Sequence, residues 1–280
     1  IHIGQKQILR DVLPDDARIV HFGGMSTYLF WARRRLENNL TLLPDPAPEY
    51  LVIGGMTQCR SYFTAVGPML RRASEQGSKI VILGGGAECY SARELRRVRE
   101  MMGRLNVHAF ISRDTYSYES YGDLAHMAWD GIDSAFFVSD AIEPVPFAFE
   151  EFIVLTFDNI REPKVTNEKN GCPQRKVGSH GVIDGGGMTV IRTHHDCWPE
   201  FWRRSHFEKA ATLVSDLPTD YLYLYARAHT VYTDRVHACI PTLAFGNRAR
   251  WYCGGSPRTR MFERIGAEGI TVEPTRCDLS

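Results

Sequence analysis

The residues with the clearest chemical potential form the run Thr233-Asp234-Arg235-Val236-His237, between a short β-branched segment and an apolar segment that closes at Gly246. Glycine suits the first position beyond a helix, so we expect Arg235 and His237 in the first turn of a helix. Helix N-termini favour anions, an arginine fork matches a carboxylate or phosphate, and histidine exchanges protons near neutral pH. The run therefore predicts an anion clamp beside a proton-transfer group. The alternative is a structural Asp234–Arg235 ion pair with His237 capping the helix.

A second polar run, Ile111–Glu119, also follows an apolar segment and opens a helical one. Arg113 would lie at the carboxyl end of a strand, where open α/β sheets bind ligands. Asp114 and Ser117 are residue types that cap helix N-termini. The run predicts a second anion-binding arginine, and the alternative is helix capping with a surface arginine.

Three glycine clusters follow apolar segments: Gly23-Gly24, Gly54-Gly55 and Gly84-Gly85-Gly86. Glycine allows a close approach of the backbone to a ligand or to another segment. None of the clusters fits the dinucleotide fingerprint or the phosphate-binding loop of nucleotide hydrolases. They predict tight turns after strands, and they argue against a dinucleotide cofactor or ATP hydrolysis.

Histidine and cysteine raise the question of a metal site around Thr193–Pro199 (THHDCWP), with Cys172 and His180 upstream. Their spacing fits no common zinc pattern, so we expect no metal and interpret the segment as a ligand-lining or plain loop. No GxSxG elbow supports serine hydrolysis. The seven cysteines are odd in number and include no CxxC pair, which is typical of reduced thiols and predicts a cytoplasmic protein.

Composition argues against two classes of protein, nucleic-acid binders and membrane-spanning proteins. Lys+Arg and Asp+Glu are both 33, so the formal net charge is zero and a general nucleic-acid binder is not indicated. No apolar run approaches the roughly 18 residues of a membrane span.

The elements that must position these residues alternate along the chain. Short, continuous apolar runs, several of them followed by glycine, are typical of buried parallel strands. In the first half they are Ala17–Phe22, Glu49–Ile53, Lys79–Leu83, Val107–Ser112 and Ser134–Val138, with helices at Tyr62–Gln76 and Ser91–Leu105.

A proline-rich break near 142–150 separates a second series. We expect strands at Phe152–Phe157, Met188–Arg192 and Thr230–Thr233, helices at Trp198–Leu217 and Arg235–Ala244, and a long loop over Asn159–Gly187. The fold class is therefore α/β, with two Rossmann-like doubly wound domains, 1–146 and 147–280, facing across a cleft.

In order, these segments resemble the polysaccharide pyruvyl transferase family over roughly residues 3–265. Ile3–Leu9 is similar to the family's N-G-D-x-x-I opening. Val81–Gly86, Ser112–Ser117 and Val138–Ala141 follow its middle motifs, and Val231–Ala238 is similar to its T-x-R-x-H signature.

This resemblance implies a GT-B-like arrangement and a transferase that moves pyruvate from phosphoenolpyruvate onto a sugar diol as a ketal, releasing phosphate. Arg113 and Arg235 would hold the donor, brought together by domain closure, and His237 would protonate its methylene carbon. No cofactor other than this donor substrate is implied. The acceptor would be a sugar or glycan, with peripheral membrane association if it is lipid-linked.

Two departures bear on the resemblance. Gln5 replaces the acid of the opening motif, and Asn247–Arg250 adds charge after Gly246, where the family usually has proline and apolar residues. Two alternatives stay open: a nucleotide-sugar glycosyltransferase of the same architecture, for which Glu263 is the obvious acidic residue for a ribose, and a non-catalytic binding protein of this fold.

Overall fold

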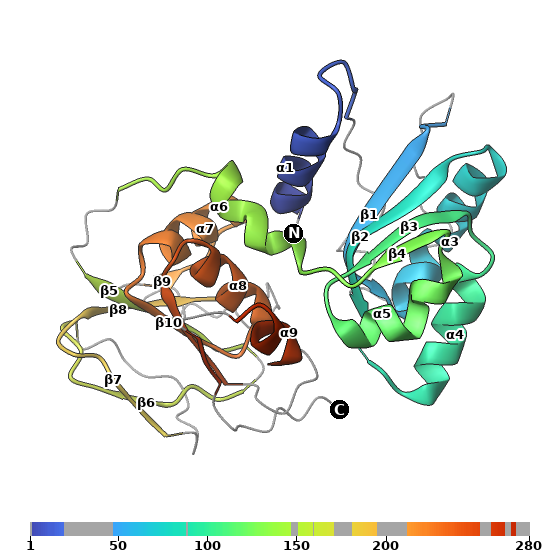
Figure 1. Ribbon diagram of the computed structural model, residues 1–280. Helices are drawn as coiled ribbons and strands as arrows, with labels where there is room; N and C mark the ends of the chain where they lie inside the picture. The colour runs from blue at the N-terminus through green and yellow to red at the C-terminus, as the bar shows by residue number, and fades with distance from the viewer. Residues whose placement is uncertain are drawn as a thin grey trace. The chain divides into compact units, whose positions relative to one another are not determined.

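The chain forms two compact units, Ile1–Ser134 and Ala135–Ser280. The sequence had placed this boundary twelve residues later, after 146. The computed structural model (Figure 1) describes residues 2–19, 47–87, 89–146, 151–158, 160–170, 181–194, 212–252, 259–266 and 270–272. No helix within these ranges is long and apolar enough to cross a bilayer.

In unit 1, the described strands form a parallel sheet in the order β1-β2-β3-β4. The elements follow the expected alternation: α1 (His2–Val12), β1 (Tyr50–Gln58), α3 (Arg60–Glu75), β2 (Lys79–Ala87), α4 (Ala92–Met102), β3 (Val107–Ser112), α5 (Thr115–Tyr121), a 3-10 turn (Gly122–Leu124) and β4 (Met127–Trp129). The expected strands in β1, β2 and β3 and the helices in α3 and α4 are confirmed.

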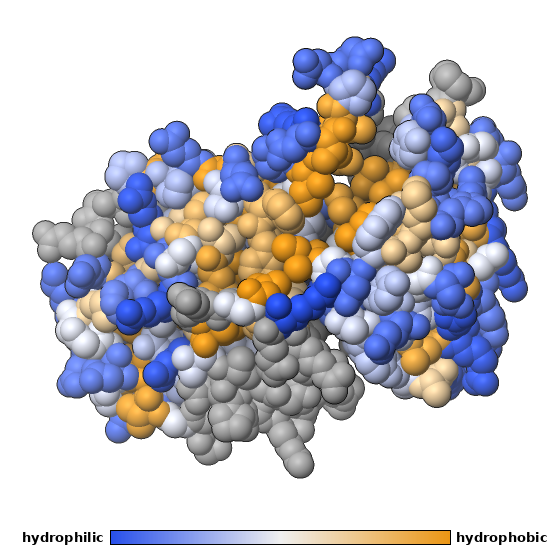
Figure 2. Space-filling model, viewed as in Figure 1, coloured by the Kyte–Doolittle hydropathy of each residue, from blue (hydrophilic) through white to orange (hydrophobic). Residues whose placement is uncertain are grey.

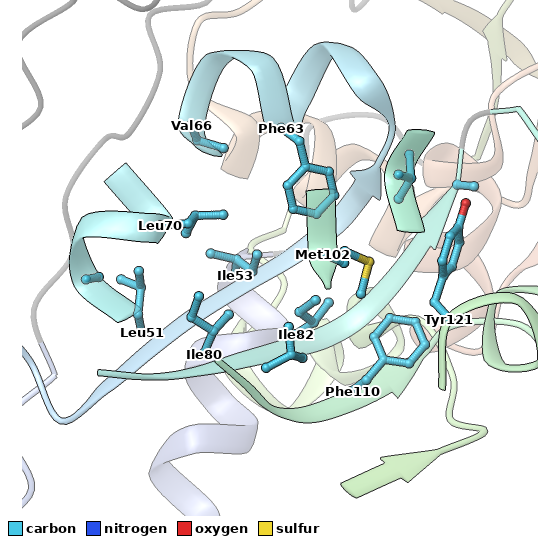
Figure 3. Close-up of a cluster of buried hydrophobic side chains, with 14 residues drawn as sticks. Leu51, Ile53, Phe63, Val66, Leu70, Ile80, Ile82, Met102, Phe110 and Tyr121 are labelled. Carbon is cyan, nitrogen blue, oxygen red and sulfur yellow. The ribbon is translucent and has the colours of Figure 1, made fainter. Parts of the chain in front are cut away.

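The core of unit 1 lies where α3 and α4 pack on the sheet. Phe63 and Leu70 of α3 point toward Ile53 and Ile82, and Met102 of α4 completes the cluster (Figure 3). The charged side of α4 is hydrophilic at the surface, at the right of the view in Figure 2. Burial of aliphatic and aromatic side chains on one side of each helix is what the spacing of apolar residues predicts.

The start of α4 is capped by its own residues. The Ser91 hydroxyl accepts a hydrogen bond from the Glu94 backbone N–H at 3.3 Å, which is one half of a capping box. The Glu94 carboxylate accepts a bond from the backbone N–H of Arg60, at 2.6 Å, which ties α4 to the start of α3.

Two of the three glycine clusters, Gly54-Gly55 and Gly84–Gly86, were expected to follow their strands, and for these two the expectation is wrong. Gly54-Gly55 and Gly84–Gly86 lie inside β1 and β2, and the two strands shift register at these glycines. Gly84 has a φ of +69°, which glycine adopts without steric cost. The space at Gly54 is filled by Gln5 of α1, whose Nε2 donates to the Leu83 carbonyl at 2.8 Å. The glycines therefore admit another segment of the chain.

Two further expectations for the first half fail or cannot be compared. Ser134–Val138 is not a strand: Ser134–Phe137 is a 3-10 helix and Val138–Ala141 is α6. The place beside β3 is taken by β4, and this apolar run forms helix instead, with Ala135 and Val138 buried. Of the strand expected at Ala17–Phe22, residues 17–19 have no regular structure, and residues 20–24, including Gly23-Gly24, lie outside the described residues.

In unit 2, the described strands form a parallel sheet in the order β12-β11-β10-β5-β8-β9. The elements after α6 are β5 (Phe152–Thr156), β6 (Lys164–Thr166), β7 (Val182–Asp184), β8 (Thr189–Thr193), β9 (Thr212–Leu213), α7 (Pro218–Arg227), β10 (Thr230–Thr233), α8 (Val236–Ala244), β11 (Arg248–Trp251), α9 (Thr259–Arg264) and β12 (Ile270–Val272). The strands expected in β5, β8 and β10 and the helix in α8 are confirmed.

Both faces of the central strands of unit 2 are covered. Val154 packs with Leu224 of α7 and Ala238 of α8. On the opposite face, Leu155 packs with Val165 and Ile183. Burial on both faces explains why β5 is continuously apolar.

The long loop expected over Asn159–Gly187 is wrong, because it contains β6 and β7, which pair in parallel. Each of these strands buries one central residue, Val165 or Ile183, which leaves too little periodicity to recognise. The helix expected over Trp198–Leu217 is wrong at Thr212–Leu213, which form β9 at the end of the described sheet, and residues 198–211 lie outside the described residues.

Candidate functional site

The carboxyl edge of the unit 2 sheet gathers polar side chains from three strands. β5 and β10 pair in parallel with Thr156 opposite Thr233, and β5 also pairs with β8. The residues that follow these strand ends therefore meet at one edge, where α/β sheets bind ligands: Asp158 after β5, His194 after β8, and Asp234 and Arg235 after β10.

Asp158 is the centre of this group. Its side chain is 1% exposed, its Oδ2 accepts a hydrogen bond from Nε of Arg235, and its Oδ1 lies 3.2 Å from Nδ1 of His194. The Arg235 side chain remains 27% exposed. The Asp158 carboxylate thus contacts an arginine and a histidine, and the arginine reaches the surface.

Asp234 holds the backbone of the same segment. Its carboxylate accepts hydrogen bonds from the backbone N–H groups of Asp158, at 3.1 and 3.2 Å, and of Ile160, at 2.8 Å. The ion pair that Arg235 forms with Asp158 therefore differs from the Asp234–Arg235 pair that the sequence left open as a structural alternative.

The expected helix start is confirmed one residue further along. Arg235 is the N-cap of α8, with an extended backbone, and its N–H donates to the Thr233 hydroxyl at 2.9 Å. His237 is half-buried in the first turn of α8. Gly246 follows the helix with a φ of +79°, as expected of a glycine beyond a helix. Arginine and histidine therefore flank the positive end of the helix dipole.

Two buried groups behind this edge keep their protons at neutral pH. Burial raises the pKa of the Cys239 thiol, and the negative charge of Asp234 raises it further. Burial likewise raises the pKa of Tyr225, although hydrogen bonds with Thr156 and Thr193 oppose the shift. Neither group is suited to act as a base.

Arg113 lies in unit 1, immediately after β3, as the sequence predicts. Its side chain is 1% exposed and lies against Gly86. Its Nη2 donates to the Ala87 carbonyl at 3.2 Å, and its nearest carboxylate oxygens are Oδ2 of Asp133, 3.7 Å from Nη1, and Oδ2 of Asp114, 3.8 Å from Nε. The positive charge of Arg113 is therefore already faced by two carboxylates within its own unit.

Asp114 is the predicted N-cap of α5. Its carboxylate accepts a bond from the Ser117 backbone N–H at 2.7 Å and from the Tyr90 hydroxyl at 3.1 Å. The helix capping expected in the second polar run is therefore confirmed for Asp114. Arg113 is buried, not at the surface as the capping alternative expected.

The structure brings Arg235 and His237 together on α8 and places Arg113 in the other unit. Sequence reasoning missed Asp158, although a signal was present: an acidic residue directly after an apolar strand. Among the histidines and cysteines considered for a metal, His194 lies at the edge described above, while 195–199, Cys172 and His180 lie outside the described residues. Within the described ranges, no group of three or more His, Cys, Asp or Glu residues is placed to hold a metal ion.

The charged residues after Gly246 belong to regular structure. Arg248–Trp251 is strand β11, in which Arg248 and Arg250 are exposed and Ala249 and Trp251 are buried. Nδ2 of Asn247 donates to the carbonyls of Tyr225 and Ala226 and so secures the end of α7.

No protein-family model matches the chain. No curated protein matches it either.

Solved structures do share its fold. S. aureus MnaA, determined with UDP, is 12% identical over 82% of this chain and 64% of its own, with a TM-score of 0.51. A Listeria monocytogenes protein provisionally assigned as a UDP-N-acetylglucosamine 2-epimerase is 12% identical over 98% of this chain and 74% of its own, with a TM-score of 0.51. A further UDP-N-acetylglucosamine 2-epimerase is 15% identical over 97% of this chain and 72% of its own, with a TM-score of 0.50.

The chain therefore spans slightly less than two thirds of the S. aureus protein. Two of these neighbours are named, one of them provisionally, as UDP-N-acetylglucosamine 2-epimerases, and at such low identity the likeness concerns the fold. Together with the two parallel sheets and their helices, it confirms the expected fold class: the protein is a GT-B-like pair of Rossmann-type α/β domains.

Proposed function

We propose that this protein is an enzyme of sugar or glycan biosynthesis that binds a phosphate-bearing donor at the carboxyl edge of β5, β8 and β10. The observation that carries the proposal is the pairing of Arg235 with buried Asp158 at the start of α8, with His237 in the first turn. A partly exposed arginine at a helix N-terminus provides a charged fork and the positive end of a dipole, which together suit a phosphate.

A sugar nucleotide is the first candidate donor. Two neighbours of the same fold are named as UDP-N-acetylglucosamine 2-epimerases, one of them provisionally, and a third was determined with UDP. In this function Arg235 binds a phosphate of the nucleotide, and the chemistry occurs on the attached sugar. The acidic residue considered for the ribose, Glu263, lies on α9.

Phosphoenolpyruvate is the second candidate donor, favoured by the arrangement of Thr233–His237 at the end of β10 and the start of α8. In this function Arg235 binds the donor and His237 protonates its methylene carbon, while Arg113 stays buried beside two carboxylates of unit 1. One acceptor hydroxyl attacks the resulting cation and a second displaces phosphate, which leaves pyruvate as a ketal on a sugar diol.

Calorimetric titration of the full chain with UDP, UDP-N-acetylglucosamine and phosphoenolpyruvate separates these donors. We expect one class to bind and Arg235→Ala to weaken that binding at least about tenfold, because a charge-assisted hydrogen bond is lost. Arg248→Ala, which removes an exposed arginine of β11, is the matched control and should leave affinity unchanged.

Turnover then tests the reaction. With phosphoenolpyruvate and a panel of galactosides, mannosides and amino sugars, His237→Ala should abolish phosphate release and retain donor binding. Binding of neither donor class to the wild-type chain would leave a non-catalytic binding protein of this fold and end the proposal.

A further inference from the structure

The Asp158–Arg235 contact is part of a closed arrangement between two loops. Asp234 and Arg235 are consecutive in the sequence, yet they hold different parts of Asp158. The Asp234 carboxylate accepts hydrogen bonds from the Asp158 backbone N–H, and Arg235 Nε donates to the Asp158 carboxylate. The loop after β10 is thus hydrogen-bonded to both the backbone and the side chain of Asp158.

The other side of the Asp158 carboxylate holds His194. The His194 ring is within hydrogen-bonding distance of Oδ1, and its backbone carbonyl accepts a bond of 2.7 Å from the Tyr221 hydroxyl of α7. The Tyr221 oxygen in turn accepts a bond from the Ser215 N–H at 2.9 Å. Both partners of Asp158 are therefore attached to regular structure, so their orientation is set by packing rather than by solvent.

A long arginine side chain loses rotamer entropy when a ligand fixes it. An arginine already held at Nε has lost most of that freedom before binding, so it is pre-organised for a ligand. Because Asp158 is buried and carries two partners, its charge is offset within the protein, whereas the exposed part of Arg235 faces the surface.

We propose that Asp158 is the positioning residue of the donor site: it orients Arg235 toward the donor phosphate and joins His194 to the same site. This inference rests on the proposed function. It assigns no contact between Asp158 and substrate, so its substitution should change donor affinity through the orientation of Arg235.

The test compares Asp158→Asn with Asp184→Asn in the full chain, by calorimetric titration with UDP and with phosphoenolpyruvate. Asp184 is an exposed carboxylate of the same unit that is hydrogen-bonded to Asn167 and Gly186, so both variants lose one negative charge. We expect Asp158→Asn to raise the Kd of the donor that binds wild-type protein by about 10- to 100-fold, the range of a lost charge-assisted hydrogen bond, and Asp184→Asn to change it less than about twofold. A merely structural role would lower the melting temperature without this selective loss.

If Asp158→Asn does not fold, His194→Gln tests the same arrangement from its other side, and a several-fold rise in Kd is expected. If the variants bind the donor with the same Kd as wild-type protein, or if Asp184→Asn raises the Kd as much as Asp158→Asn does, the role of Asp158 is overturned. The proposed function then remains intact. Absence of binding of either donor to wild-type protein overturns both.

Discussion

The buried ion pair between Arg192 of β8 and Glu162 offers the sharpest test of what stabilises unit 2. The Arg192 Nε atom lies 3.1 Å from both carboxylate oxygens and Nη2 lies 2.7 Å from Oε1, with side chains 2% and 4% exposed. Breaking such a pair by removing one partner typically costs about 3–5 kcal/mol, because a charge is left buried without its partner. Glu162→Gln keeps the shape of the side chain and one acceptor oxygen. We therefore expect the free energy of unfolding to fall by an amount near the lower end of this range, about 3 kcal/mol.

The double variant Glu162→Leu, Arg192→Met distinguishes this cause from a packing defect. Replacing a whole buried pair by apolar side chains is often neutral or stabilising, so the double variant should be more stable than Glu162→Gln despite carrying more changes. Such non-additivity is expected of residues in direct contact. As a control, Glu100→Gln breaks an exposed pair with Arg97 on α4 and should change stability by less than about 0.5 kcal/mol.

The chain forms two compact units, so a single unfolding midpoint does not report on unit 2 alone. Native-state hydrogen exchange resolved to peptides of β5 and β8 reports the opening of unit 2 alone. If Glu162→Gln lowers the free energy of unfolding of unit 2 by less than about 1 kcal/mol, the lost stability does not come from a buried charge without its partner. A double variant less stable than Glu162→Gln would refute that cause as well.

The remaining predictions concern glycines, a surface carboxylate and thiols. In Gly86→Ala the added methyl would lie 2.1 Å from the buried guanidinium beneath it and should lower the melting temperature, whereas Gly67→Ala, with open space in α3, should stabilise by up to about 1 kcal/mol. The pKa of Asp123 is lowered chiefly by its hydrogen bond from a neighbouring arginine, so the stability gap between wild type and Asp123→Asn should be present at neutral pH and vanish as pH falls through that pKa, as seen in urea titrations. Maleimide labelling read by peptide mass spectrometry should modify exposed Cys89 quickly and buried Cys239 only after unfolding.

Much of the secondary structure could be predicted because its cause is local. A strand buried on both faces must be continuously apolar, and this pattern identified β5. The Ser91 cap of α4 and the glycine beyond α8 needed only the residues at the helix ends.

Elements whose form depends on distant partners were predicted wrongly. Gly54 and Gly84 were predicted to follow strands, but Gln5 of α1 lies against Gly54 and Ser134 lies against Gly84, and the sequence does not reveal these contacts. Ser134–Phe137 has the composition of a strand, but β4 occupies the position beside β3. The small β6–β7 sheet depends on pairing between segments that bury one residue each.

The candidate site divides in the same way. By itself the sequence determined that an arginine and a histidine would stand together where β10 meets α8, because they are two residues apart and a strand-to-helix turn carries them both. Only the tertiary structure decided that Asp158, 77 positions from Arg235, would hold that arginine, and that His194 would share the carboxylate. The reason is physical: the neighbours of a strand's carboxyl end are set by strand order and register, which here place β5 between β10 and β8 and are established by packing across the whole sheet.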